Sequence, residues 1–445
     1  MVTDAQNIKA ISNSTITVHG RKMEYNCLRN LPAIAKSYGI KALRYKFRGM
    51  PCVVAGAGPS LSAALPILKA NQGKYILITV DRALKPLLEA DIQPHIVCTS
   101  DMDPVLNKLF MGYRIPESIA LLYDRDCFWE LPAAWRGPLI TYDTYFDTGI
   151  WEQSFMGAKG FLCKNFTVSH TALYVAQMLG CSPLIMTGVD FAYPDAVADH
   201  HVQGAVEIAD EADVLHRSHW VKFPGNVLPE VDTTEVFSIA VPAMGKQIEE
   251  IRATVINTSS VGCKIPHTTY QPLETALHAY GVGGDYQDLI DAALAADPPA
   301  YDHAALDKQT AHVIKSMTRI HDRCVEGVEV MRRLKRLDLH NSTEYNKWCR
   351  VFLKGNAILR HIQKDVFSMY LTQRPMYAST KKTAEMLESV MHLPERDLGR
   401  MAMEANRHTV FFMGMGVCSK LFVDALTAVR KEMIPCALPT SVAVL

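Results

Sequence analysis

The chain has 445 residues, enough for two or three domains that each have a hydrophobic core. Its 46 lysines and arginines balance 46 aspartates and glutamates, which excludes a general electrostatic attraction to nucleic acid or anionic lipid. No uninterrupted apolar stretch reaches the ~18 residues of a membrane span, and the N-terminus lacks the apolar core of a signal peptide, so we expect neither. Eleven cysteines without a C-x-x-C pair are typical of reduced thiols, and we predict a cytoplasmic location.

Short apolar strands alternate with helical stretches from Pro51 to about Ser260. They follow a mixed segment, residues 1–50, which ends in the basic run Lys41–Arg48. The alternation predicts a Rossmann-like, doubly wound α/β domain with a mostly parallel sheet over residues 51–283. Ligands bind to such sheets beyond the carboxyl ends of the strands, where the winding reverses. The predicted strands are Cys52–Ala55, Tyr75–Val80, His95–Thr99, Ile119–Tyr123, Leu139–Tyr142, Pro183–Thr187 and Ala253–Asn257.

The loop after the first predicted strand carries the most informative pattern of the chain. Gly56 and Gly58 permit a tight turn, and Pro59 and Ser60 favour the start of a helix. A glycine turn before a helix N-terminus brings free N–H groups and the positive end of the helix dipole to one place. We therefore expect this loop to bind a phosphate, although a plain strand-to-helix connection fits the same pattern.

Acidic residues follow three of the predicted strands. Asp81 follows the second strand, Asp101 and Asp103 follow the third, and Asp190 follows Pro183–Thr187. Carboxylates at strand ends can bind hydroxyls, amines or a metal ion, whereas aspartate is also a common helix N-cap. Both roles stay open for Asp81. For Asp101 and Asp103 we favour ligand binding, because one helix cap does not need two acids.

A second group of polar residues lies between Thr167 and Gly204. Ser169 and His170 fall at the predicted N-terminus of a helix, a position that favours an anion. Beyond the next strand, a polar loop carries His200 and His201. A histidine there can act as a general base near neutral pH, and two solvated loop histidines fit equally well. The histidines of this region lack the spacing of a zinc site, and we predict no metal centre.

The pattern changes after Gly284. Apolar residues recur at spacings of three and four from Val313 to Leu334, which predicts a long amphipathic helix. Residues 284–434 are therefore predicted to form an all-helical C-terminal domain, and residues 435–445 a tail. Its further helices are expected at Tyr345–Met369, Thr380–His392 and Asp397–Met433.

Seven short motifs occur in a fixed order: Asn30-Leu31-Pro32, Gly-Ala-Gly-Pro-Ser-Leu from Gly56, Asp81-Arg82-Ala83-Leu84, Ile92-Gln93-Pro94, Ser100-Asp101, Val168-Ser169-His170-Thr171-Ala172 and Gly188-Val189-Asp190-Phe191. Their combination, over about residues 25–275, resembles the motility accessory factor (Maf) proteins. These share a central domain with the MptE-like 6-hydroxymethylpterin pyrophosphokinases of archaea. The same regions are similar to bacterial sialyltransferases, in which a Gly-Asn-Gly-Pro-Ser-Leu loop grips a CMP donor.

The resemblance implies a glycosyltransferase that moves a nonulosonic, sialic-acid-like sugar from a CMP-activated donor to an acceptor hydroxyl, such as a flagellin serine or threonine. It implies no cofactor, a nucleotide-activated sugar and a protein acceptor as partners, and leaves a homo-oligomer open. It also implies roles for individual residues, here in chain order: donor binding by Gly56, Gly58, Pro59, Ser60 and Asp81, catalysis by Asp190, Tyr193 and either His200 or His201, and closure of the nucleotide pocket by Asn257 and Ser259.

The chain departs from the sialyltransferase pattern at two positions. Ala57 stands where those enzymes have an asparagine, and Tyr193 alone represents an aromatic pair, one position out of register. Two other functions therefore stay open. One is an ATP-dependent pyrophosphokinase of a pterin-like substrate, in which Asp101 and Asp103 would hold Mg²⁺. The other is a non-catalytic adaptor that binds a nucleotide sugar or a protein.

Overall fold

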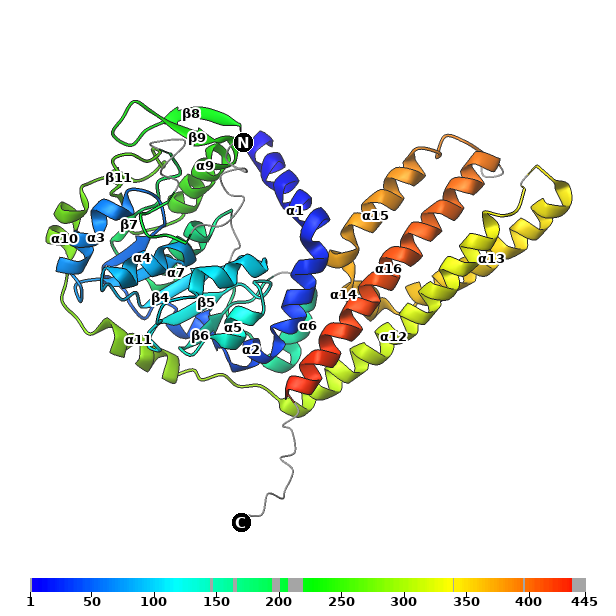
Figure 1. The fold of residues 1–445 in the computed structure, drawn as a ribbon, viewed down its shortest axis with the longest axis horizontal. Helices are drawn as coiled ribbons and strands as arrows, with labels where there is room; N and C mark the ends of the chain where they lie inside the picture. The colour runs from blue at the N-terminus through cyan, green and yellow to red at the C-terminus, as the bar shows by residue number, and fades with distance from the viewer. Residues whose placement is uncertain are drawn as a thin grey trace, which may run out of the picture. The chain divides into compact units, whose positions relative to one another are not determined.

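The computed structural model describes residues 2–144, 147–162, 166–193, 201–206, 219–338, 340–394 and 397–433. The chain divides into two compact units (Figure 1). The α/β unit comprises Ala33–Thr144 and Ala158–Ala300, and the helical unit comprises Met1–Pro32, Tyr145–Gly157 and Tyr301–Leu445. These limits differ from the predicted domain boundaries at residues 51 and 284. The helical unit takes in the N-terminal helix and a short segment from the middle of the chain.

The α/β unit is built on a nine-stranded sheet in which every pairing is parallel. Its order is β1-β6-β5-β4-β3-β2-β7-β10-β11. The strands are β1 (Tyr38–Gly39), β2 (Cys52–Ala55), β3 (Ile76–Val80), β4 (Ile96–Thr99), β5 (Ala120–Tyr123), β6 (Leu139–Thr141), β7 (Leu184–Thr187), β10 (Val255–Asn257) and β11 (Thr269–Tyr270). All seven predicted strands are present, and the doubly wound, Rossmann-like fold is confirmed.

The winding of the sheet reverses between β2 and β7. From β2 the chain adds β3, β4, β5 and β6 on one side, and then β7, β10 and β11 on the other. The residues of β2, β3, β4, β5 and β7 are all buried, as expected for parallel strands covered on both faces. Because Ala55 pairs with Thr187, the loops after β2 and β7 begin side by side.

Helices and one hairpin complete the α/β unit. The antiparallel hairpin β8 (Trp220–Pro224) and β9 (Glu230–Thr234) was not predicted from the sequence. The helices are α2 (Leu31–Lys36), α3 (Leu61–Ala70), α4 (Asp81–Glu89), α5 (Glu130–Ala134), α7 (Val168–Leu179), α9 (Glu235–Glu249), α10 (Leu273–Tyr280) and α11 (Tyr286–Ala295), with 3₁₀ turns η1 (Ile40–Leu43) and η2 (Pro104–Phe110).

The helical unit confirms the predicted all-helical region and adds α1 and α6 to it. Its helices are α1 (Val2–Arg29), α6 (Asp147–Met156), α12 (His303–Leu334), α13 (Ser342–Gln363), α14 (Val366–Leu371), α15 (Gln373–Glu388) and α16 (Leu398–Met433). The two longest, α12 and α16, run side by side (Figure 1). They approach closely at Gly327, where a Cβ atom would lie 2.7 Å from the ring of Phe412.

Within the described residues, α16 alone is long and apolar enough to cross a membrane by length and composition. The helix meets this criterion through the mean hydropathy of an 18-residue window. We based the sequence prediction on uninterrupted apolar stretches, and α16 contains none of that length. Half of its most apolar window is buried inside the structure, and the core helix of a soluble protein meets the same test. The expected absence of a membrane span therefore stays a prediction.

Buried ion pairs connect distant parts of each unit. In the α/β unit, the guanidinium of Arg125 lies 2.7 Å from Asp143 Oδ1, and both side chains are almost fully buried. The other oxygen of Asp143 accepts the N–H groups of Lys159 (2.8 Å) and Gly160 (2.9 Å). Asp143 therefore joins the end of β6 to the segment after the inserted helix α6.

The Asp143→Ala variant should lose about 3 kcal/mol or more of unfolding free energy, because Arg125 would stay buried after losing its ion pair with Asp143. Urea unfolding of the variant and the unaltered chain measures this loss. The matched control is Lys222→Ala, which removes an exposed pair with Asp232 (2.8 Å) and should cost at most about 1 kcal/mol. Equal losses in the two variants would contradict the assignment.

Candidate functional site

A cavity of about 230 Å³ lies at the carboxyl ends of β2, β3 and β7, where the winding of the sheet reverses. Its walls come from the loops after β2 and β7, the first turns of α4 and α7, and helix α9. This is the place that the fold predicts for a ligand. The predicted site residues that line it are Gly58, Pro59, Asp81, Ser169, Asp190, Tyr193 and His201.

The glycines of the predicted phosphate loop allow two backbone segments to touch. Gly56 N–H donates to Thr187 O and Gly58 N–H to Gly188 O, both at 2.8 Å. A Cβ atom at Gly56 would lie 2.3 Å from Gly188 O, and one at Gly58 would lie 2.5 Å from Asp190 Oδ2. These glycines therefore serve the close approach of the loops after β2 and β7, before any ligand is considered.

Asp190 occupies the N-terminus of α3, where the sequence predicts a ligand phosphate. One carboxylate oxygen accepts the backbone N–H of Ser60 at 2.8 Å, and the other accepts the Ser60 hydroxyl at 2.5 Å. Burial raises the pKa of Asp190, while hydrogen bonds from the Ser259 side chain and from the side chain and backbone of Ser60 act in the opposite direction. An anion does bind at this helix end, but it is a side chain of the protein. Ser60 is therefore corrected from a donor to phosphate to the partner of Asp190.

Asp81 and His201 lie on the α4 side of the cavity. Asp81 is 7% exposed and accepts the Thr99 hydroxyl and the backbone N–H of Arg82, each at 2.8 Å, while burial raises its pKa. Arg82 Nη1 lies 3.4 Å from His201 Nε2. A guanidinium has no acceptor, so the imidazole nitrogen accepts in this contact and carries no proton there. His200 falls outside the described residues.

An aromatic wall faces these polar groups. Tyr193 stacks on Phe237 with ring centroids 5.8 Å apart and an angle of 11° between the planes. Trp220 packs edge-on against Tyr193 at 5.1 Å, and Phe191 packs against Phe237 at 5.4 Å. Sequence reasoning missed Phe237, because a threonine cap at Thr234 indicates the start of α9 but not where that helix packs.

His170 does not reach the cavity, which corrects its predicted role in ligand binding. Its side chain is fully buried. Nε2 lies 3.1 Å from Ala240 O and so donates to it, and Nδ1 lies 2.8 Å from the Thr167 hydroxyl, which donates to it. Burial lowers the pKa of His170 to about 4, so the ring is neutral at pH 7. Its neighbour Ser169 does line the cavity.

Six other predicted site residues also lie outside the cavity lining: Gly56 and Ser60, described above, and Asp101, Asp103, Asn257 and Ser259. Asp101 accepts the N–H of Asp103 at 3.0 Å, and Asp103 precedes the 3₁₀ turn η2, so the pair shapes a turn. Asn257 and Ser259 are buried at the end of β10, where Ser259 N–H donates to Asn257 Oδ1 at 3.1 Å. Within the described residues, Asn257 Nδ2 has no hydrogen-bond partner, and no three acids, histidines or cysteines gather as a metal site.

Comparisons with known proteins agree with the fold. Residues 25–196 match the family model of 6-hydroxymethylpterin diphosphokinase MptE-like proteins. The solved structure of the MAf glycosyltransferase from Magnetospirillum magneticum AMB-1 superimposes with a TM-score of 0.54 at 15% sequence identity, covering 93% of this chain. No curated protein sequence matches.

The chain is thus a Rossmann-like α/β protein with a cavity at the reversal of its sheet. Residues 25–196 are similar to MptE-like proteins, and the predicted resemblance to the Maf and MptE-like family is confirmed. The chain spans about 60% of the length of the MAf structure, and at this identity the likeness shows a shared fold.

The neutral state of His170 predicts a pH dependence of stability. Its pKa is about 4 when folded and 6.5 when exposed, so the unfolded chain binds the proton first as the pH falls. The unaltered chain should therefore lose up to about 3 kcal/mol between pH 6.5 and pH 4 from this residue. In His170→Gln this part of the loss should vanish.

Denaturant unfolding of both proteins across that pH range measures the difference. The half-buried His95 and the buried His408, whose pKa values are also about 4, are present in both proteins and cancel. Parallel stability curves for the two proteins would refute the buried, neutral state of His170.

Proposed function

We propose that the chain is a glycosyltransferase that binds a nucleotide-activated sugar in the cavity between β2 and β7. The observation that carries the proposal is the pairing, in one cavity, of an aromatic wall with a helix N-terminus and a histidine–arginine contact. The fold shared with a MAf glycosyltransferase supports the same class of reaction. A cytoplasmic location agrees with such an enzyme.

The two sides of the cavity suit the two parts of a nucleotide sugar. Tyr193 and Phe237 offer flat apolar surfaces on which a base or a sugar ring can stack. Val168 and Ser169 also line the cavity, and as the first two residues of α7 their N–H groups have no partner within the helix. Since Asp190 already fills the N-terminus of α3, the donor phosphate goes to α7.

His201 and Arg82 supply the chemistry in this proposal. Nε2 of His201 takes the proton of the acceptor hydroxyl, the acceptor oxygen attacks the anomeric carbon, and the bond from that carbon to the phosphate oxygen breaks. The leaving phosphate keeps the electron pair, and Arg82 and the first turn of α7 stabilise its negative charge. When Arg82 turns to the phosphate, it leaves Nε2 of His201 available as the base.

The finer assignment follows from the resemblance rather than from the cavity. We propose CMP as the nucleotide, a nonulosonic acid as the sugar and a serine or threonine of a protein such as flagellin as the acceptor. The reaction needs no cofactor, because the donor is already activated. The helical unit, which a nucleotide-binding domain does not require, is proposed to recognise the protein acceptor.

One observation favours a second function. The family model that matches residues 25–196 is described as a diphosphokinase. Such an enzyme would bind ATP and Mg²⁺, and Asp101 and Asp103 are the acids that the sequence offers for the metal. Neither residue lines the cavity, so this function would need a ligand site that extends toward η2.

The two functions predict different nucleotide responses. Thermal unfolding of the full chain with CMP, CTP, ATP or GTP, each with and without Mg²⁺, should show stabilisation by CMP that needs no metal. A ligand that binds only the folded state raises Tm according to its affinity. Stabilisation by ATP that depends on Mg²⁺ would reject the glycosyltransferase in favour of the kinase, and no response would favour the adaptor.

The His201→Asn variant should keep its stabilisation by CMP but release CMP from a CMP-activated sialic acid at least about 100-fold more slowly, because the general base is lost. The matched control is His219→Asn, an exposed histidine outside the cavity lining, which should leave both readouts unchanged. Undiminished release by His201→Asn would remove His201 from the mechanism.

A further inference from the structure

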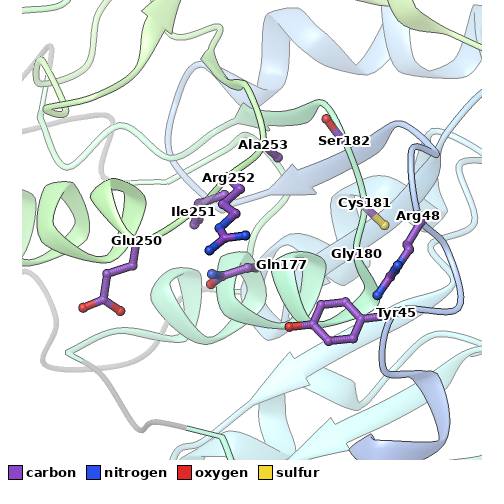
Figure 2. Close-up of a pocket in the computed structure, with 10 residues that line it drawn as sticks. All are labelled: Tyr45, Arg48, Gln177, Gly180, Cys181, Ser182, Glu250, Ile251, Arg252 and Ala253. Atoms are coloured by element: carbon purple, nitrogen blue, oxygen red, sulfur yellow. The ribbon is translucent and has the colours of Figure 1, made fainter.

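A second and larger cavity, of about 680 Å³, lies at the amino-terminal edge of the same sheet. Its lining precedes three neighbouring strands: Arg48 comes before β2, Ser182 before β7, and Ala253 before β10. The C-terminal turn of α7 forms the remaining wall, and Gln177 and Arg252 point into the same space (Figure 2). Since parallel strands all begin at one edge, this cavity lies across the sheet from the proposed donor site.

The frame of this cavity is held by backbone hydrogen bonds. The N–H groups of Tyr45, Phe47 and Gly49 donate to the carbonyls of Met178, Leu179 and Gly180, at 2.8, 2.9 and 3.2 Å. The segment that carries Tyr45 and Arg48 is thus fixed against the end of α7. These bonds also occupy carbonyls at the negative end of the helix, which would otherwise repel an anion.

Two arginines and one acid, Glu250, line the cavity (Figure 2), and Glu250 makes no ion pair with either arginine among the described residues. Arg48 ends the basic run Lys41–Arg48, for which the proposed function has no use, and Arg252 adds a second guanidinium. Neither arginine makes an ion pair within the described part of the chain; Arg48 lies over the ring of Tyr45 at 5.0 Å. A third group points to a ligand: Gln177 Oε1 is buried, and no described residue donates a hydrogen bond to it. Buried acceptors are rarely left in this state.

We infer that this cavity binds a small phosphorylated metabolite. Guanidinium groups match the geometry and charge of phosphate, so the phosphate lies between Arg48 and Arg252. A hydroxyl or amine of the same molecule donates to Gln177 Oε1. The volume lies within the range of small-molecule sites and exceeds what phosphate alone would fill. Sugar phosphates and nucleotides share this chemistry. The site is independent of the proposed glycosyltransferase activity, since it uses no residue of the donor cavity.

Titration calorimetry of the full chain with ribose 5-phosphate, at about 0.15 M salt, tests the site. Arg48→Gln and Arg252→Gln should each weaken binding at least about tenfold. The matched control is Lys46→Gln, which removes the same charge from the same exposed segment but outside the cavity lining, and binding should change less than about twofold. Gln177→Leu should weaken ribose 5-phosphate but not inorganic phosphate, which does not need the acceptor.

Three outcomes would overturn the inference. The first is an absence of binding by the unaltered chain at millimolar ligand. The second is an equal loss in Lys46→Gln and Arg48→Gln, which would mean diffuse surface attraction. The third is a lower Tm of both arginine variants without any loss of binding, which would mean that the arginines serve only the negative end of α7.

Titration with CMP distinguishes a nucleotide from a sugar phosphate as the ligand of this cavity. A nucleotide is indicated if CMP binds at two sites and Arg48→Gln removes one of them. A sugar phosphate is indicated if ribose 5-phosphate binds and CMP keeps a single site that Arg48→Gln leaves intact. Because the CMP site between β2 and β7 is read separately, failure of this inference and failure of the proposed function are distinguishable.

Discussion

The two hydrogen bonds from Ser60 to Asp190 are the interaction on which the ligand cavity depends. They join the loop after β2 to the loop after β7, at the only pair of neighbouring strands between which the described sheet reverses its winding. A buried carboxylate needs such donors, and a helix N-terminus needs such an acceptor, so each group satisfies the other. The close contacts of Gly56 and Gly58 follow from this junction, because any side chain there would push the loops apart.

Much of the sheet could be predicted because its strands are short, apolar and buried on both faces. The hairpin β8–β9 escaped prediction because β9, from Glu230 to Thr234, is mostly polar and its partner is half-exposed. The two-residue strands β1 and β11 are too short to leave a pattern. The boundaries of the two units were harder to predict than the strands, because no local sequence pattern indicates that α1 packs against α15 and α16.

The residue types of the candidate site could be predicted from the sequence, but the hydrogen bonds between them could not. The pattern after β2 correctly indicates an anion at the N-terminus of α3, yet no local rule reveals that the anion belongs to a residue 130 positions away. His170 shows the same limit: its place at a helix start suggests a ligand, whereas its burial depends on Ala240 of a later helix. Burial and long-range pairing, rather than residue identity, decide which of the predicted groups face the cavity.

The buried pair of Glu24 and Arg374 gives the helical unit a consequence for synthesis on the ribosome. Glu24 is fully buried, and its charge is met by an arginine 350 residues later, at 2.9 Å. At about 5–20 residues per second, translation separates the two by roughly 20–70 s. The α/β sheet has all its strands by residue 270 and can fold in this interval, whereas α1 must wait. A nascent chain therefore holds Glu24 of α1 without its arginine through most of its synthesis, and the helical unit cannot complete its core before translation reaches Arg374.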